Sequence, residues 1–142
     1  MSRDPNCIFC KIVVGEIPAL VVLNTPDVLG FLDIGPLSEG HVLLVPKSHA
    51  ERLTDLSRET AGAIGGLLPA VGRALVKVTE ADGFNVLQNN GAVAGQVVGH
   101  VHFHLIPRSA GDGLGYRWIP GTYPEGRAET VAHALRDALA RA

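Results

Sequence analysis

The sequence has little charge of either sign, and this scarcity excludes several classes of partner. Charged residues make up 18% of the 142 residues, and 12 Lys and Arg against 14 Asp and Glu leave a formal net charge of −2. A chain with this balance has no bulk electrostatic attraction for a nucleic acid polymer or for an anionic membrane. We therefore expect any phosphate that it binds to belong to a small molecule.

The chain also lacks long apolar runs. Residues 1–6 do not resemble the hydrophobic core of a secretory signal, and no stretch suggests the apolar length of a membrane span. We therefore expect a cytoplasmic protein without a membrane partner. Hydrophobic residues still make up 46% of the chain, enough for one packed core at this length. The sequence thus predicts a single domain over 1–142.

Cysteine is scarce as well, since Cys7 and Cys10 are the 2 cysteines of the chain and form a Cys-x-x-Cys pair. In a reducing compartment this spacing indicates a metal clip or a redox pair rather than a structural disulfide. A redox pair is the weaker interpretation, because the motif does not follow a strand and open a helix. A pair of small buried hydrophobic side chains is the other alternative.

Hydrophobic periodicity predicts an α+β domain, with helices packed on an antiparallel sheet of about five strands. A central helix is expected over 58–80, with Ser57 as its N-cap and Pro69 kinking or splitting it. Apolar residues that recur every four positions from Val131 indicate a C-terminal helix. The expected strands are residues 20–23, 28–33, 41–46 and 84–88, and one that contains the histidines near residue 100.

A cluster of histidines lies at 99–108, where His100, His102 and His104 supply three of the chain's 6 histidines. In an extended strand alternate side chains share a face, so these imidazoles would line one face and apolar residues the other. Histidine has no special preference for strands, which makes chance a poor explanation. The row indicates either metal ligation or nucleophilic and acid–base chemistry.

One set of side chains is suited to a metal. Cys7, Cys10, His49 and His100 are a Cys₂His₂ set of the kind that zinc takes in tetrahedral geometry. Their separations along the chain are too long for a zinc finger. The set can therefore bind zinc only if the fold brings the N-terminal cysteines close to both histidines.

Three further features could contact a ligand. The loop 89–96 contains glycines that let the backbone approach a ligand, and its amide groups could hold phosphate oxygens. Asp33, at the end of an expected strand, could bind a ribose diol or simply cap a turn. His41 begins the third expected strand and, if it lies beside the histidine row, could set the tautomer of a neighbour.

The pattern His-Val-His-Phe-His-Leu-Ile at 100–106 resembles the signature of the histidine triad (HIT) superfamily. Other blocks, in the same order along nearly the whole chain, look like the Hint branch of that family. These blocks are residues 7–12, 15–18, 31–34, 40–49 and 85–91, and Trp118.

The resemblance implies a hydrolase or transferase that acts on purine nucleoside 5′-phosphates, typically adenosine phosphoramidates or related adenylates. It assigns His102 as the nucleophile that forms a covalent nucleotidyl-histidine, His104 as its partner at the phosphate, and His41 as a supporting histidine. The nucleotide-binding residues that it implies are Asp33 for the ribose, Asn89 and the backbone of Gly95 and Gln96 for the phosphate, and Phe9, Phe31 and Ile34 for the base.

The resemblance also implies a structural zinc on the Cys₂His₂ set and a homodimer with Trp118 near the partner subunit. The chain departs from the family at Val97, where members active on phosphoramidates often carry a hydroxyl residue that helps the leaving group. A dinucleoside polyphosphate hydrolase or phosphorylase is one alternative function. A nucleotide-binding regulatory protein with incidental turnover is the other.

Overall fold

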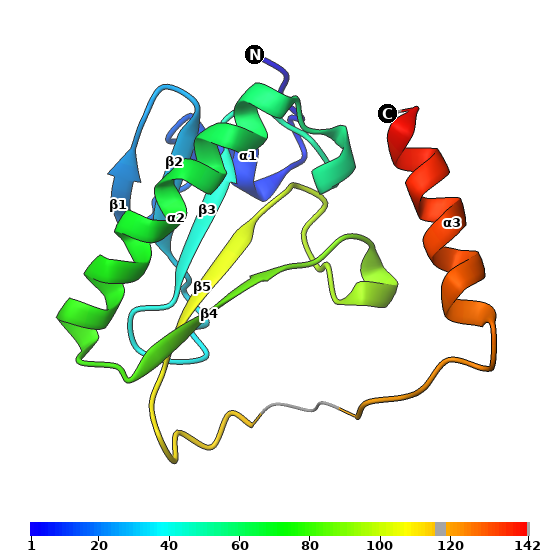
Figure 1. Cartoon of the computed structure of the whole chain (residues 1–142). Coiled ribbons are helices and arrows are strands. Elements are labelled where there is room, and N and C mark those ends of the chain that lie inside the picture. The colour runs from blue at the N-terminus through cyan, green and yellow to red at the C-terminus, as the bar shows by residue number, and fades with distance from the viewer. Residues whose placement is uncertain (116–118, 142) are drawn as a thin grey trace.

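The computed structural model describes residues 1–115 and 119–141, so Trp118 lies outside the described residues. The chain folds into an α+β structure with one antiparallel sheet, which confirms the predicted fold class (Figure 1). The elements, in order, are α1 (Ile8–Val13), β1 (Val21–Asn24), β2 (Val28–Leu32), β3 (Val42–Pro46), η1 (Leu53–Asp55), α2 (Arg58–Thr79), β4 (Gly83–Gln88), η2 (Ala92–Ala94), β5 (Phe103–Arg108) and α3 (Arg127–Ala140).

The 5-stranded sheet has the order β1-β2-β3-β5-β4, and its central strand β3 is buried throughout. Val42 and Leu44 pack with α2 in one apolar cluster, whereas Leu43 and Val45 pack with α1 in another. This division follows from the alternation of side chains along a strand. His104 lies opposite Leu43 in the antiparallel register, so it shares the α1 face of the sheet.

The helix α2 is continuous, so Pro69 does not split it, which was one of the two outcomes expected there. Ser57 caps its start by accepting a hydrogen bond from the Thr60 N–H, as predicted. Pro69 cannot donate to the Gly65 carbonyl, but both residues are exposed, and water can bond the free carbonyl there. A proline on the solvent side therefore removes one bond without dividing the helix.

The apolar character of α2 corrects one expectation. Its length and its mean hydropathy of 1.3 reach those of a membrane span, although no stretch of that kind was expected. Ile64, Val71 and Leu75 are buried and pack against the sheet, so part of this apolar surface serves helix-on-sheet packing. The side that faces away from the sheet leaves Val78 81% exposed.

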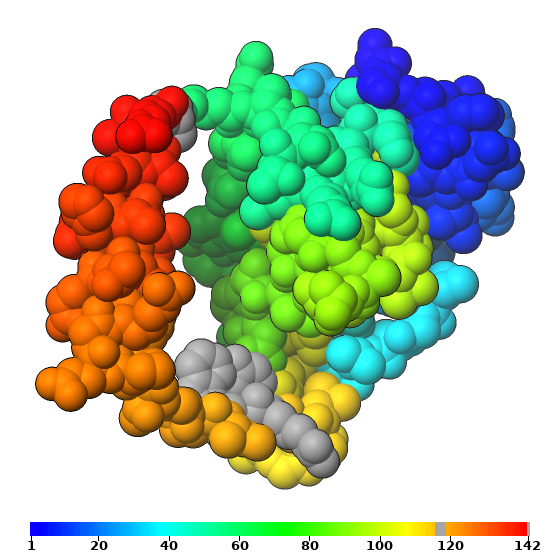
Figure 2. Space-filling view, turned by 90° about the vertical axis from the view of Figure 1, so that its right-hand side faces the viewer, coloured from blue at the N-terminus to red at the C-terminus, as the bar shows by residue number. Residues whose placement is uncertain are grey.

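Two elements differ from the sequence prediction. β5 begins at Phe103, so His100 lies in a bend before the strand, and the three histidines do not form a single strand row. The C-terminal helix α3 has no buried residue and stands apart from the sheet instead of packing on it (Figure 1, Figure 2). Local periodicity predicts that a helix forms, but it does not say what covers the apolar side of that helix.

The close approach of α2 to β4 can be tested with two glycines of α2. A Cβ added at Gly72 would lie 2.3 Å from Phe84 Cζ, whereas one added at Gly65 meets nothing within 4 Å. Both Gly→Ala changes gain about 1 kcal/mol of helix propensity, so their difference isolates the clash. We expect Gly72→Ala to be less stable than Gly65→Ala by about 1–3 kcal/mol in urea unfolding. Equal stabilities would mean that α2 and β4 are not in tight contact.

Candidate functional site

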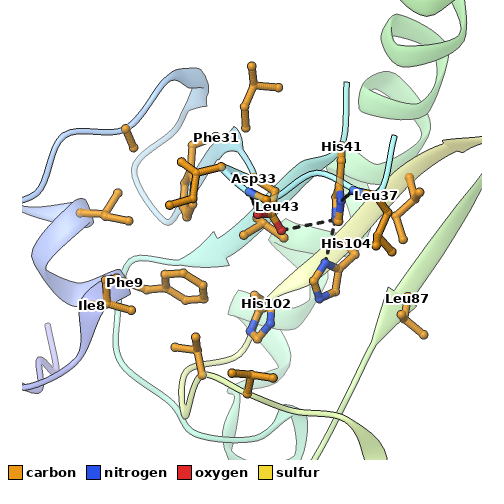
Figure 3. Close-up of a pocket in the computed structure, with 18 of the residues that line it drawn as sticks. Ile8, Phe9, Phe31, Asp33, Leu37, His41, Leu43, Leu87, His102 and His104 are labelled. Carbon is orange, nitrogen blue, oxygen red and sulfur yellow. Dashed lines mark hydrogen bonds and ion pairs between the residues drawn. The ribbon is translucent and has the colours of Figure 1, made fainter. Parts of the chain in front are cut away.

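A cavity of about 590 Å³ opens on the α1 face of the sheet (Figure 3). Its walls are mostly apolar and it has few polar groups, as is typical of small-molecule sites. Nine of the residues expected to bind the nucleotide or act in catalysis line it: Phe9, Phe31, Asp33, Ile34, His41, Asn89, Gly95, His102 and His104.

His102 is held in one orientation and one tautomer. Its side chain is buried, and its Nδ1 lies 2.7 Å from the carbonyl oxygen of His100. A carbonyl can only accept, so Nδ1 carries the proton and Nε2 keeps its lone pair. Phe9 packs edge-on against the imidazole, with ring centroids 5.1 Å apart. The free Nε2 is therefore the nitrogen that can attack an electrophile.

His104 is oriented by His41 through a short chain of hydrogen bonds. The Leu37 N–H donates to Nδ1 of His41 at 3.0 Å, so the proton of the neutral His41 ring must be on Nε2. Nε2 of His41 lies 2.9 Å from Nδ1 of His104 and donates to it (Figure 3). The proton of His104 is therefore on its own Nε2.

Burial keeps both of these rings neutral. Burial, together with the neighbouring His102 and His41, lowers the pKa of His104 to about 4. Burial also lowers the pKa of His41, although the Asp33 carboxylate opposes this shift. Both imidazoles are therefore uncharged at pH 7, which agrees with the hydrogen-bond chain.

Asp33 has two partners in this structure. Its Oδ1 accepts a hydrogen bond from the Gly35 N–H at 2.8 Å, so the carboxylate caps the turn after β2. Its Oδ2 lies 3.7 Å from Nε2 of His41 at the cavity wall. The sequence left open whether Asp33 caps a turn or faces a ligand, and this geometry permits both.

Gln96 is the one expected nucleotide contact that does not line the cavity. Its side-chain oxygen accepts from the Gly91 N–H at 2.7 Å, and its Nε2 donates to the carbonyls of Glu51 and Val98. Its backbone N–H donates to the Gly91 carbonyl at 3.1 Å. The side chain therefore holds the shape of the loop, and Gly95, which does line the cavity, is held in place by it.

The four expected metal ligands come together beneath the cavity. Their ligand atoms all lie within 4.8 Å of one another, and Cys7, Cys10 and His100 are buried. The Nδ1 atom of His100 lies 3.3 Å from Cys7 Sγ, 3.6 Å from Cys10 Sγ and 3.2 Å from His49 Nδ1. Ligand bonds of normal length give a zinc tetrahedron edges of about 3.3–3.8 Å. The separations therefore fit a tetrahedral zinc site.

The tautomer of His100 also suits a metal. Its Nε2 lies 2.8 Å from the Pro46 carbonyl and must donate to it, so the lone pair is on Nδ1, toward the cysteines. Burial lowers the pKa of His100 to about 4, which keeps the ring in its ligating, neutral form. Asp33, His41 and His104 also cluster, but the 2.9 Å between the two ring nitrogens is a hydrogen-bond distance.

The sequence missed the helix that carries the cysteines. Cys7 is the N-cap of α1 and its sulfur accepts from the Cys10 N–H, so the Cys-x-x-Cys motif does open a helix. One half of the reason given against a redox pair is therefore wrong, and the other half stands, because no strand precedes α1 in the described part of the chain. The surrounding histidines, rather than the absence of a helix, favour a metal clip. A stretch as short as 8–13 is a weak helix signal, because it is too brief to show a helical periodicity.

The chain is similar in sequence and in structure to several known proteins. A family model described as HIT domain matches residues 14–111. An adenosine 5′-monophosphoramidase of Candida albicans is 44% identical over 150 residues, covering 99% of this chain and 96% of the relative. The crystal structure of SMU.412c from Streptococcus mutans has a TM-score of 0.92 at 37% identity and covers 97% of this chain and 88% of that one.

A Zn-bound histidine triad family protein from Mycobacterium smegmatis is similar as well. It has a TM-score of 0.74 at 38% identity and covers 94% of this chain and 97% of that one. The family model spans most of the chain, and the relatives share both its sequence pattern and its fold. The chain therefore belongs to the HIT family.

Proposed function

We propose that the chain hydrolyses purine nucleoside 5′-phosphoramidates or related nucleotidyl adducts and releases the nucleoside monophosphate. The observation that carries this proposal is the orientation of His102, whose Nδ1–H is bonded to a backbone carbonyl and whose Nε2 is free in the cavity. The similarity to the adenosine 5′-monophosphoramidase of Candida albicans supports the choice of substrate class. The HIT family membership supports a nucleotide hydrolase.

In the proposed reaction, Nε2 of His102 attacks the α-phosphorus and the bond to the leaving group breaks. The nucleotide is then held on the imidazole until water attacks the same phosphorus and the electron pair returns to Nε2. The bond from Nδ1–H to the His100 carbonyl stabilises the charge that the ring carries meanwhile. Nε2–H of His104 and the side-chain amide of Asn89 would face the phosphoryl oxygens, whereas the Gly95 N–H is already bonded to the Ala92 carbonyl.

The apolar end of the cavity suits a purine base. Phe9 and Phe31 meet edge to face, with ring centroids 5.7 Å apart, and Ile34 extends this apolar wall. Asp33 lines the same cavity, and its Oδ2 lies 3.7 Å from Nε2 of His41. We propose that the base stacks on the wall and that the Asp33 carboxylate accepts from the ribose hydroxyls.

We also propose that Cys7, Cys10, His49 and His100 bind a structural zinc ion. Four protein ligands leave no open position, so zinc would link α1 to the ends of β3 and β5 rather than act on substrate. The match of the ligand separations to a tetrahedron supports this, as does the Zn-bound relative from Mycobacterium smegmatis.

A homodimer is the third part of the proposal. The apolar residues of α3, such as Leu135 and Leu139, are exposed, as is Val78 on the outer side of α2. On the edge strand β4, Phe84 and Val86 are also partly exposed. A second copy could cover these surfaces, and α3 would then belong to the same domain, 1–142. A cytoplasmic location stays a prediction.

Removing the nucleophile tests the mechanism. We expect His102→Asn to lower turnover of adenosine 5′-phosphoramidate by about 10⁴-fold while nucleotide binding persists, because the lost group acts in the transition state. Steady-state kinetics and calorimetric titration with AMP measure the two effects. The matched control is His133→Asn, which changes an exposed histidine on α3.

Three results would contradict parts of this proposal. Turnover that survives in His102→Asn would exclude the covalent mechanism. Faster hydrolysis of diadenosine tetraphosphate than of the 4-nitrophenyl ester of AMP, which also releases a weakly basic anion, would favour a dinucleoside polyphosphate hydrolase. Nucleotide binding without turnover in the unsubstituted chain would favour a regulatory protein.

The low pKa of His104 predicts how stability depends on pH. In the fold His104 takes up a proton only near pH 4, whereas an unfolded histidine does so near pH 6.5. Between these values the unfolded chain binds more protons, so the free energy of unfolding must fall as the pH is lowered from about 6.5 to about 4. Urea unfolding across this range should show a smaller fall for His104→Asn than for the unsubstituted chain. Equal slopes would mean that His104 titrates normally in the fold.

Metal removal tests the zinc centre. We expect about one zinc per chain in the purified protein and a lower Tm after treatment with a chelator, because four ligands leave the metal buried. Cys10→Ser should lose the metal and show the same lower Tm, whereas His133→Asn should keep both zinc content and Tm. Elemental analysis and circular dichroism provide the measurements. A chain that holds no zinc, or whose Tm ignores the chelator, would count against a structural metal.

A further inference from the structure

The cavity has few groups that could give a proton to a leaving group. Among the described residues that line it, the polar side chains are Asp33, His41, Asn89, His102 and His104, and the others are apolar or glycine. This lining contains no hydroxyl, ammonium or guanidinium group. The scarcity has a chemical consequence, because some leaving groups need a proton as they depart and others do not.

Most of these polar groups are already bonded. Nε2–H of His41 donates to His104, and Nδ1–H of His102 donates to a backbone carbonyl. The Asn89 amide is not an acid, and Asp33 accepts a hydrogen bond from a backbone N–H. The one remaining proton that these side chains could give to a leaving group is therefore the proton on Nε2 of His104. Because the pKa of His104 is low, its ring is neutral, and a neutral imidazole is a weak acid.

Val97 is a cavity-lining side chain that carries no hydrogen-bond donor. It lines the cavity two positions after Gly95 and is 93% exposed, whereas its neighbour Val98 packs against the apolar cluster of α1. Asn89, Gly95 and Val97 line the cavity together with His102 and His104. This stretch therefore presents a side chain of methyl groups, and no hydroxyl, to the cavity.

The basicity of the leaving group decides what this arrangement can cleave. An amine cannot leave phosphorus as its anion, so its nitrogen must take a proton while the P–N bond breaks. A carboxylate, a phosphate or a nitrophenolate leaves as a stable anion and needs no proton. A cavity without a suitable acid therefore discriminates between these two classes of adduct.

We propose that Val97 makes the site selective for nucleotidyl adducts whose leaving group departs as a weakly basic anion, in preference to phosphoramidates of simple amines. The inference rests on the proposed function and narrows its substrate class. Nε2 of His102 bonds to phosphorus, the P–O bond breaks, and the departing oxygen keeps the electron pair. Water then adds its hydroxyl to phosphorus, its proton goes to solvent, and the P–N bond returns its pair to His102.

The test compares two leaving groups on the full chain. The substrates are the 4-nitrophenyl ester of AMP, which releases a weakly basic anion, and adenosine 5′-phosphoramidate, which releases ammonia. Val97→Thr keeps the branched shape and adds a hydroxyl, whereas Val97→Ala removes bulk and adds no donor. We expect Val97→Thr to raise the ratio of kcat/KM for the phosphoramidate to that for the ester about 10-fold or more. Val97→Ala should leave this ratio as it is in the unsubstituted chain.

Both variants should fold, because the Val97 side chain is exposed. An unchanged ratio in Val97→Thr would overturn the inference, and so would an equal rise in both variants, which would assign the effect to bulk. Mass spectrometry of the chain mixed with the ester separates this failure from that of the proposed function. A nucleotide on His102 with an unchanged ratio would retain the proposed function, whereas no labelling and no hydrolysis of either substrate would remove it.

Discussion

The junction between the end of β3 and the start of β5 is the contact on which the rest of the site depends. Nε2–H of His100 donates to the Pro46 carbonyl at 2.8 Å, and the Val101 N–H donates to the Ala50 carbonyl at 2.8 Å. These bonds hold the segment before β5 against the segment after β3. The candidate zinc ligands meet at this junction, and the carbonyl that orients His102 lies on the same segment.

Three neighbouring histidines acquire different chemistry from their backbone surroundings. His100 gives its proton to a carbonyl through Nε2 and offers Nδ1 to the cysteines, whereas His102 gives its proton through Nδ1 and keeps Nε2 free. His104 accepts at Nδ1 and retains a proton on Nε2. Equal side chains thus become a ligand, a candidate nucleophile and a donor, because each carbonyl or N–H selects one tautomer.

Proton supply is the property that distinguishes this cavity from a general acid–base site. Burial lowers the pKa of both His104 and His41 and keeps the rings neutral, so the cavity is poor in acidic protons, while Nε2 of His102 keeps a free lone pair. Such a site suits attack on phosphorus followed by loss of a group that is stable as an anion. Val97, which also lines the cavity, adds an apolar side chain and no proton donor.

Local patterns in the sequence determined the α+β class, the antiparallel strands, the presence of the helix α2 and the residue types at the two candidate centres, because these depend on periodicity and side-chain chemistry. They predicted a kink or a split at Pro69, so the continuity of α2 was decided by the fold. The same patterns also predicted the membership of the HIT family, which the family model confirms. Only the tertiary structure decided that Gln96 turns away from the cavity, that α3 stands off the sheet, and which nitrogen of each histidine is free. The reason is physical: these outcomes depend on backbone groups such as the carbonyl of Pro46 and the N–H of Leu37. Such groups carry no side-chain signature, and the fold alone brings them to their partners.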